Sequence, residues 1–104
     1  MVPREVWKKA GAQGLLCTDV PTEYGGGGVD DFRYNVVITE ELCRVGASGV
    51  GFPLHNDVVV PYLLAHASDE QKQRWLPSMC SGETITAIAM TEPGTGSDLA
   101  GVKA

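Results

Sequence analysis

Four consecutive glycines, Gly25–Gly28, constrain the fold of this 104-residue chain more than any other feature. Glycine has no side chain to restrict its backbone, so neither a helix nor a strand tolerates a run of four well. The run lies within residues 14–31, which we expect to form a long connecting loop. Regular structure must therefore lie on the two sides of this loop.

A short helix is predicted before the loop, over about residues 3–12. Pro3 suits the first position of a helix, where no backbone N–H is needed. Gly11 and Gly14 favour the end of the helix. Trp7 lies on its apolar face, and we expect this tryptophan to be a packing anchor rather than a platform for a cofactor.

A longer helix is predicted after the loop. Asp30 or Asp31 can cap its N-terminus, and Gly46 can end it. Between these residues, apolar side chains recur at helical spacing and form a broad face. Glu40 and Arg44 are four residues apart and should form an ion pair near the end of the helix.

Two further helices are predicted in the middle of the chain. Residues 57–67 are apolar enough for a mostly buried helix, with Pro61 in its first turn. The sequence Ser-Asp-Glu-Gln at residues 68–71 has the spacing of a capping box, so another helix starts there. Pro77 must either end that helix or bend it.

The sequence pattern changes after Gly82. Residues 84–91 alternate between small apolar side chains and a mixed set, which is typical of a β-strand. We therefore expect two parts: an N-terminal α-helical domain at residues 1–82, and the beginning of a β-domain at residues 83–104.

Composition and charge argue against several classes of function. The net charge is −5 and no Lys/Arg cluster could neutralise phosphates, so we expect no nucleic-acid partner. The apolar runs are far too short for a membrane span. Three cysteines without a C-x-x-C pair argue against a disulfide framework or a zinc site and fit a reducing compartment. His55 and His66 lack supporting ligands, so we expect no metal site.

A glycine-containing loop follows the predicted strand directly. It runs from Thr91 to Asp98, and its two glycines let the backbone approach a ligand closely and present amides and hydroxyls to it. Such a loop can bind a polar cofactor. A tight surface turn, in which Ser97 and Asp98 cap the next element, explains the same residues equally well. The chain has no Gly-Lys-Ser/Thr of a P-loop, and the Gly25–Gly28 run does not match G-x-G-x-x-G, so spacing alone does not name a ligand.

The run AIAMTEPGTGSDLAG at residues 87–101 resembles the signature of acyl-CoA dehydrogenases, which are flavoproteins, and is closest to the long-chain type. The rest of the chain is similar to the N-terminal helical domain of this family, through DVPTEYGG at residues 19–26, the paired Glu40 and Glu41, and SDEQK at residues 68–72. The implied fold is mainly α: the N-terminal helical domain of the acyl-CoA dehydrogenase fold, followed by the first strand and loop of the middle β-domain. The family usually has a smaller residue where Thr95 stands.

The resemblance also implies how the loop and the strand before it bind their ligands. The cofactor would be FAD, with Ile88, Met90 and Thr91 along its isoalloxazine ring and Ala89 beside them. Gly96 and Ser97 would lie near the FAD pyrophosphate, and Ser97 would also contact the acyl-CoA substrate. No residue of this chain would be catalytic, because the family places its glutamate base in a later helical domain.

The implied reaction is the oxidation of a fatty acyl-CoA to the trans-2-enoyl-CoA in fatty acid β-oxidation, with electrons passed to electron-transfer flavoprotein. The full-length protein would be a homotetramer, cytoplasmic in a bacterium and in the mitochondrial matrix of a eukaryote. This chain would be an inactive fragment of it. The alternatives are an acyl-CoA oxidase or flavin monooxygenase relative of the same fold, and a non-catalytic helical interaction module.

Overall fold

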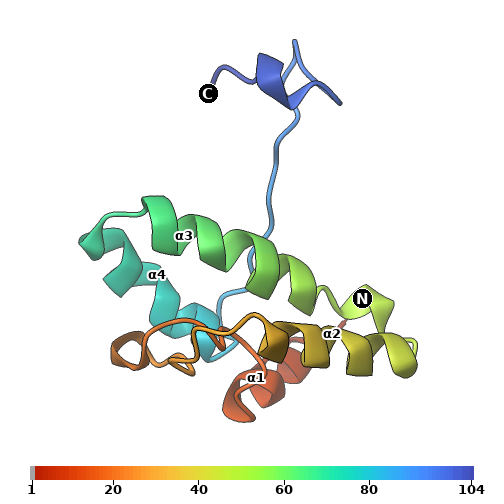
Figure 1. Cartoon of the computed structure of the whole chain (residues 1–104), viewed down its shortest axis with the longest axis vertical. Helices are drawn as coiled ribbons and strands as arrows, with labels where there is room; N and C mark the ends of the chain where they lie inside the picture. The colour runs from red at the N-terminus through yellow and green to blue at the C-terminus, as the bar shows by residue number, and fades with distance from the viewer. Residues whose placement is uncertain (1) are drawn as a thin grey trace.

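A computed structural model describes residues 2–104 as a helical body, residues 2–83, from which a C-terminal tail, residues 84–104, extends (Figure 1). The α-helices of the body are α1 (Arg4–Ala12), α2 (Arg33–Arg44), α3 (Val60–His66) and α4 (Asp69–Cys80). Short 3-10 turns lie at Thr22–Tyr24, Ser48–Val50 and Leu99–Gly101, and a π-helical stretch lies at Leu54–Val59. The predominance of helix confirms the mainly α class.

Helix α1 confirms the helix that was predicted before the loop. Pro3 is its N-cap residue, and Gly14, with a φ of +72°, follows its C-terminus. Trp7 is buried, and its ring packs edge-on against the ring of Phe52, with 4.7 Å between the centroids. The tryptophan is therefore a packing anchor, as predicted.

Two glycines let α1 and the end of α4 approach each other closely. Gly11 stays inside α1, where a Cβ atom would lie 2.5 Å from the carbonyl oxygen of Ser81. Gly82 has a φ of +76°, and a Cβ atom there would lie 2.2 Å from the carbonyl oxygen of Trp7. Any larger residue at either position would push the two helices apart.

The predicted long loop packs back onto the body. The amide of Val29 donates to the carbonyl of Thr18 at 2.9 Å, and the amide of Gly27 donates to that of Cys17 at 3.2 Å. Loop residues also enter the core, which lies between α1, the loop, α3 and α4. The buried core residues are Trp7, Ala10, Leu16, Cys17, Val20, Tyr24, Phe52, Val60, Leu76, Met79 and Cys80.

Helix α2 forms where it was predicted, with two differences in detail. The N-cap residue is Phe32, which has no side-chain cap bond, so neither Asp30 nor Asp31 takes the predicted position, although the Asp31 Oδ1 accepts a hydrogen bond from the amide of Arg33 at 3.0 Å. The predicted ion pair between Glu40 and Arg44 is wrong, because Arg44 pairs with Glu41 instead. Side chains three residues apart also lie on the same side of a helix, so this spacing competes with the predicted one.

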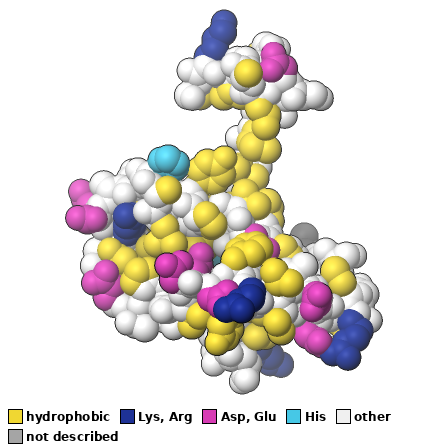
Figure 2. All heavy atoms as spheres, viewed as in Figure 1, with side chains coloured by type: hydrophobic (Ala, Val, Ile, Leu, Met, Phe, Trp, Pro, Cys, Tyr) yellow, Lys and Arg dark blue, Asp and Glu magenta, His cyan; other side chains and the backbone are white. Residues whose placement is uncertain are grey.

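The apolar face of α2 is largely exposed. Asn35 is the buried residue of this helix. The large apolar side chains on and beside α2 that stay more than one-third exposed are Phe32, Tyr34, Val36, Val37 and Val45. Figure 2 shows hydrophobic side chains interleaved with charged ones over the visible face of the body. The described chain therefore leaves this helix without a complete cover.

The third predicted helix begins earlier than expected. Helical conformation starts at Phe52, passes through the π-helical stretch and continues as α3 to His66; we call residues 52–66 the helical rod. Pro61 lies in the first turn of α3, as predicted. The prediction of a mostly buried helix is wrong, because Val60 is buried whereas Tyr62 is 56% exposed. Residues 2–104 cover only one side of the rod.

Helix α4 begins with the predicted capping box. The Ser68 Oγ accepts a hydrogen bond from the amide of Gln71 at 3.2 Å, and the Gln71 Oε1 accepts one from the amide of Ser68 at 2.9 Å. Pro77 does not end the helix, which continues to Cys80. The capping box therefore fixes the start of α4. The burial of Leu76, Met79 and Cys80 stabilises the helix on both sides of the proline.

The predicted strand at residues 84–91 does not form within the described chain. These residues run outward from the body as an open trace (Figure 1), and no strand among residues 2–104 lies beside them. Within residues 2–104 the β pairing is limited to one isolated bridge between Glu92 and Thr95. A strand needs a partner for its backbone hydrogen bonds, and alternation in the sequence cannot supply one.

Candidate functional site

Two threonines, Thr84 and Thr86, contact the helical body at the start of the tail. The Thr84 amide donates to the carbonyl of Ser78 at 2.9 Å, and the Thr84 hydroxyl donates to the Ser78 Oγ at 2.8 Å. Two residues later, the Thr86 Oγ1 lies 2.9 Å from the Nδ1 atom of His55. The first residues of the tail are thus fixed both to α4 and to the helical rod.

His55 connects the core to the base of the tail. Its side chain is fully buried, and its Nε2 atom lies 3.3 Å from the carbonyl oxygen of Met79. With the proton on Nε2, the ring donates to this carbonyl and accepts the Thr86 hydroxyl at Nδ1. Burial lowers the pKa of His55 more than the bond to Met79 raises it, so the ring is neutral near pH 7. His55 is thus a hydrogen-bonded core residue, whereas His66 is exposed.

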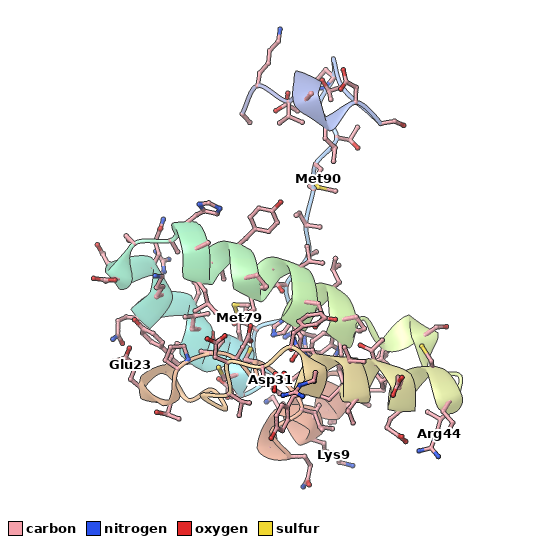
Figure 3. The ribbon with its side chains drawn as sticks, in the orientation of Figure 1. Lys9, Glu23, Asp31, Arg44, Met79 and Met90 are labelled. Atoms are coloured by element: carbon pink, nitrogen blue, oxygen red, sulfur yellow. The ribbon has the colours of Figure 1, made fainter. Side chains whose placement is uncertain are left out.

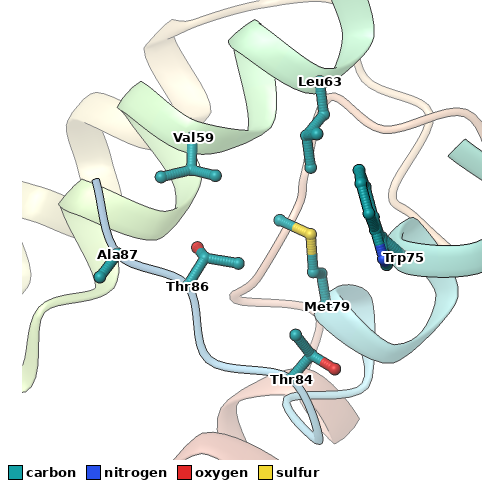
Figure 4. Close-up of a pocket in the computed structure, with 7 residues that line it drawn as sticks. All are labelled: Val59, Leu63, Trp75, Met79, Thr84, Thr86 and Ala87. Carbon is teal, nitrogen blue, oxygen red and sulfur yellow. The ribbon is translucent and has the colours of Figure 1, made fainter. Parts of the chain in front are cut away.

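A pocket of about 270 Å³ lies beside this anchor (Figure 4). It is lined by residues of the rod, α4 and the tail, namely Val59, Leu63, Trp75, Met79, Thr84, Thr86 and Ala87. In Figure 4, Val59 and Leu63 project from the helix toward Thr86 and Met79. No sequence pattern predicted this pocket, because three separate segments of the chain build it. The one sequence signal for it was that Thr84 and Thr86 alternate with apolar residues.

The glycine-containing loop at the end of the tail folds as a tight turn. Glu92 and Thr95 exchange both backbone hydrogen bonds, each 3.0 Å long. Pro93 and Gly94 lie between them at the corner of the turn. Two residues between a hydrogen-bonded pair is the shortest common hairpin connection, so the loop has a defined local shape.

Side chains of the loop stabilise this shape from within. The carboxylate of Glu92 accepts hydrogen bonds from the amides of Lys103 at 3.0 Å and Ala104 at 2.9 Å. The Thr95 hydroxyl donates to the carbonyl of Gly101 at 3.0 Å. The Thr95 side chain therefore adds an internal hydrogen bond to the loop.

Asp98 caps the short 3-10 turn that follows the loop. Its Oδ1 accepts a hydrogen bond from the amide of Ala100 at 3.2 Å. Ser97, which the surface-turn interpretation also assigned to capping, is exposed and makes no such bond within residues 2–104. The surface-turn interpretation therefore explains Asp98 but leaves the serine without a structural role.

The six residues predicted to bind a cofactor lie in two groups. Ile88, Ala89, Met90 and Thr91 form the first group, along the open segment before the turn, and Gly96 and Ser97 form the second, after it. Ile88 is partly buried, and the others are exposed. Within the described chain no hydrogen bond joins the two groups. Both groups belong to the part of the chain that extends from the helical body (Figure 1).

The residues of the tail suit the polar atoms of a flavin nucleotide. Inside residues 2–104, the amides of residues 85–91 have no hydrogen-bond acceptor, and the Thr91 and Ser97 hydroxyls are exposed. Amides and hydroxyls are the groups that can donate to ring heteroatoms and to a pyrophosphate. A Cβ atom at Gly96 would meet nothing within 4 Å, and its φ is not in the left-handed region. A residue with a side chain would therefore fit at position 96 of the described chain.

Two acidic residues lie at the edge of the core. Burial raises the pKa of Asp19 above its usual range, and one of its oxygens is buried without a hydrogen-bond partner among residues 2–104. Burial also raises the pKa of Asp57, although this carboxylate accepts a hydrogen bond from Asn35 at 2.9 Å. Across the described residues, no group of three or more potential ligands gathers to hold a metal ion.

Comparisons with known proteins agree on one family. Residues 1–83 match the family described as acyl-CoA dehydrogenase, N-terminal domain. The chain is 47% identical over 102 residues to the mitochondrial long-chain specific acyl-CoA dehydrogenase of Mus musculus, covering 98% of this chain and 24% of that protein. It is 40% identical to the mitochondrial isovaleryl-CoA dehydrogenase of Bos taurus, covering 96% of this chain and 24% of that protein.

A solved structure supports the same assignment. The acyl-CoA dehydrogenase from Geobacillus kaustophilus is 56% identical to this chain and superposes with a TM-score of 0.88, covering 97% of this chain and 26% of that structure. The chain therefore belongs to the acyl-CoA dehydrogenase family and contains its N-terminal domain. It spans about a quarter of the length of the mouse and bovine relatives. Among residues 2–104, no helix combines the length and apolar character that crossing a membrane requires.

Proposed function

We propose that this chain is the N-terminal part of an FAD-dependent acyl-CoA dehydrogenase that oxidises a fatty acyl-CoA to the trans-2-enoyl-CoA. One observation carries the proposal: the family match over residues 1–83 continues directly into a segment, residues 85–91, whose amides have no acceptor in the described chain, and the Thr91 and Ser97 hydroxyls are exposed beside it. Such donors suit the polar atoms of a flavin nucleotide. The change from the helical domain to a β-domain near Gly82 is part of the same proposal.

The tail residues would bind FAD in two ways. Ile88, Ala89 and Met90 would pack along the isoalloxazine ring, while the Thr91 hydroxyl and nearby amides donate to its heteroatoms. Gly96 would let the backbone approach the pyrophosphate, and Ser97 would lie near the pyrophosphate and also contact the acyl-CoA. FAD, when bound, would accept a hydride from the substrate. The turn between Glu92 and Thr95, which the described chain forms by itself, would set the spacing between the two groups.

The remaining parts of the activity would lie outside these 104 residues. The glutamate base, the rest of the β-domain and the C-terminal helices would come from the remainder of the parent polypeptide. A strand partner there would complete the open segment at residues 84–91, and packing there would cover α2. The assembled protein would be a homotetramer that passes electrons to electron-transfer flavoprotein in β-oxidation.

Full-length parent enzyme with changes in the tail tests this proposal. Removing the hydroxyl in Thr91→Val or Ser97→Ala should lower the affinity for FAD or acyl-CoA by about tenfold, the effect of losing one hydrogen bond to a polar or charged ligand. Bound flavin is measured by absorbance and activity by reduction of a dye with a fatty acyl-CoA. Ser48→Ala, an exposed serine on the body, is the matched control and should change neither.

The same assays separate the other functions. Reduction of oxygen in place of the dye would assign the parent protein to the oxidase or monooxygenase relatives. A parent protein without bound flavin and without activity on any acyl-CoA would instead favour an interaction module. The 104-residue chain alone should bind FAD weakly or not at all, and a stoichiometric yellow complex of micromolar affinity would contradict the division of the site between this chain and the rest.

A further inference from the structure

His55 lies where the helical rod, α1, α4 and the tail meet. Its side chain is fully buried. The Nε2 atom lies 3.3 Å from the carbonyl oxygen of Met79 on α4, and the ring packs edge-on against that of Trp7 on α1, with 5.2 Å between the centroids. The Cys17 Sγ lies 3.6 Å from the same Nε2 atom. Contacts from three separate segments therefore fix the orientation of the imidazole.

The second ring nitrogen of His55 faces the tail. The Nδ1 atom lies 2.9 Å from the Oγ1 of Thr86. With the proton on Nε2, Nδ1 accepts a hydrogen bond from the Thr86 hydroxyl. Burial lowers the pKa of His55, which keeps the ring neutral and leaves Nδ1 able to accept. Within the described chain no other hydrogen bond involves residues 85–91. This bond therefore attaches the segment to the helical body.

Burial alternates along the same segment. Residues 84, 86 and 88 are half-buried, whereas residues 85, 87 and 89 are exposed. An extended chain turns successive side chains to opposite faces, so Thr86 lies in the middle of the face that meets the body. A shift by one residue would exchange the two faces. No strand among residues 2–104 fixes the register of the segment, so the bond between His55 and Thr86 selects the face.

The selected face decides which side chains a ligand meets beyond Thr86. Ile88 follows Thr86 by two positions and Met90 follows it by four, so an extended chain places all three on one face. With the faces exchanged, Ala89 and Thr91 would take the places of Ile88 and Met90. The imidazole thus controls the segment from a distance of a few residues.

We propose that His55 is a positioning residue of the flavin site, and that it sets, through Thr86, the face that residues 88–91 present to FAD. This role rests on the FAD site proposed above and adds to it a residue of the core. His55 would not touch the cofactor. A binding group must be held in its productive orientation by the residues behind it, and a misplaced group loses affinity.

Full-length parent enzyme with changes at Thr86 tests this role. Thr86→Val removes the hydroxyl but keeps the shape of the side chain, and it should weaken FAD binding about fivefold, the effect of one ordinary hydrogen bond. Thr86→Ser keeps the hydroxyl and should bind FAD within about twofold of the unchanged enzyme. Titration of the apoenzyme with FAD, followed by flavin fluorescence, measures each affinity.

Thr84→Val is the matched control for Thr86→Val. It makes the same substitution in the same face of the tail, but the Thr84 amide stays bonded to the carbonyl of Ser78. FAD affinity should therefore change by less than about twofold. Equal losses in Thr84→Val and Thr86→Val would overturn the proposal, because they would reflect a general loosening of the tail.

A double-variant cycle shows whether His55 acts through Thr86. His55→Gln keeps a donor for the Met79 carbonyl but has no acceptor at the Nδ1 position. It should weaken FAD binding as much as Thr86→Val, and the two changes together should cause no further loss, because both break the same bond. A purely structural histidine would lower the melting temperature and leave the FAD affinity of the folded enzyme unchanged. That result, or additive losses, would overturn the proposal.

Nitrogen NMR of the 104-residue chain tests the bond without the cofactor. The Nδ1 resonance of His55 should shift in Thr86→Val and keep its position in Thr86→Ser, with the proton on Nε2 in both. A resonance that does not respond to Thr86→Val would overturn the role of His55 and leave the proposed flavin site intact. Absence of flavin from the unchanged full-length enzyme would overturn the proposed function, and the role of His55 with it.

Discussion

Met79 and Met90 represent two regions of this molecule that differ in what surrounds them. Met79 lies in the core of the helical body and is fully buried, whereas Met90 stands on the tail, away from the body, and is 48% exposed (Figure 3). Both residues are apolar, and they lie eleven positions apart. The helical body therefore covers apolar side chains of its own core, whereas the described chain leaves apolar side chains of the tail such as Met90 exposed.

The tail nevertheless has local order of its own. The turn between Glu92 and Thr95 forms by backbone hydrogen bonds, and the Glu92 carboxylate binds two later amides. Apolar side chains that remain exposed in the tail include Ile85, Met90 and Leu99. A loop shaped by short-range bonds and flanked by exposed apolar residues is suited to bind a ligand and to pack against further chain.

Hydrogen exchange should give the largest contrast between the two regions. Amides of α4 around Leu76 should be protected by a factor of about 10³ or more, because they exchange only through extensive unfolding of the body. Amides of residues 85–91 should exchange at nearly the rate of an unstructured peptide, because the described chain gives them no acceptors. Mass spectrometry of exchanged peptides measures both. Equal protection of the tail and α4 would contradict the contrast.

Truncating the two methionines is the direct energetic test of the comparison. Met79→Ala should lower the free energy of unfolding by about 3 kcal/mol, because it removes a fully buried side chain and leaves a cavity. Met90→Ala is the matched control and should change it by less than about 0.5 kcal/mol. Urea denaturation of the 104-residue chain measures both values. A large effect of Met90→Ala would mean that the tail packs on the body in solution.

The pH dependence of stability tests the histidine that joins the two regions. Because burial lowers the pKa of His55 in the folded state, the unfolded chain takes up its proton first. The contribution of His55 is fully present above the unfolded pKa of about 6.5 and is lost as pH falls below that value, by at most about 1.4 kcal/mol per pH unit.

The control for this pH effect is the His55→Gln variant, compared with the unchanged chain at each pH. Asp19 and Asp57 have raised pKa values, so both carboxyls favour the folded state in the protonated form and oppose the histidine effect as pH falls. Both chains share these two carboxyls, so the difference between the chains isolates His55. Parallel curves of unfolding free energy against pH would show that His55 does not titrate as inferred.

The smallest expected effect concerns a helix cap. Ser68→Ala removes one partner of the capping box of α4 and should destabilise the body by about 1 kcal/mol. Asp98→Ala removes the analogous cap of the 3-10 turn in the tail and should leave the global unfolding free energy unchanged within about 0.3 kcal/mol. Thermal unfolding followed by circular dichroism measures both. Equal losses would show that the tail unfolds together with the body.

Local signals in the sequence predicted much of the body. The capping box at Ser68, the glycine at position 14 after α1 and the loop around Gly25–Gly28 each depend on neighbouring residues alone, so sequence patterns identified them. The errors concern long-range packing. Which acid pairs with Arg44 and how much of the rod is buried depend on side chains and segments that spacing does not reveal.

The candidate site shows the same division. The glycine-containing loop could be recognised in the sequence as a motif. Its resemblance to the acyl-CoA dehydrogenase signature implied FAD as the ligand, and FAD binding by residues 88–97 stays a proposal. The pocket beside Thr84 and Thr86 could not be predicted from the sequence, because the helical rod and α4 supply most of its lining residues.

Sequence patterns alone predicted the positions of α1 and α2, the start of α4, the long loop between α1 and α2, and the family to which the chain belongs. Each of these depends on residues a few positions apart or on a motif read along the chain. The three-dimensional structure was needed to show that α1 and α4 touch through Gly11 and Gly82 and that His55 links the core to Thr86. It also showed that residues 84–91 have no strand partner within residues 2–104. Burial and strand pairing each require a second segment of chain that packs against the first, and the sequence of one segment does not reveal which segment that is.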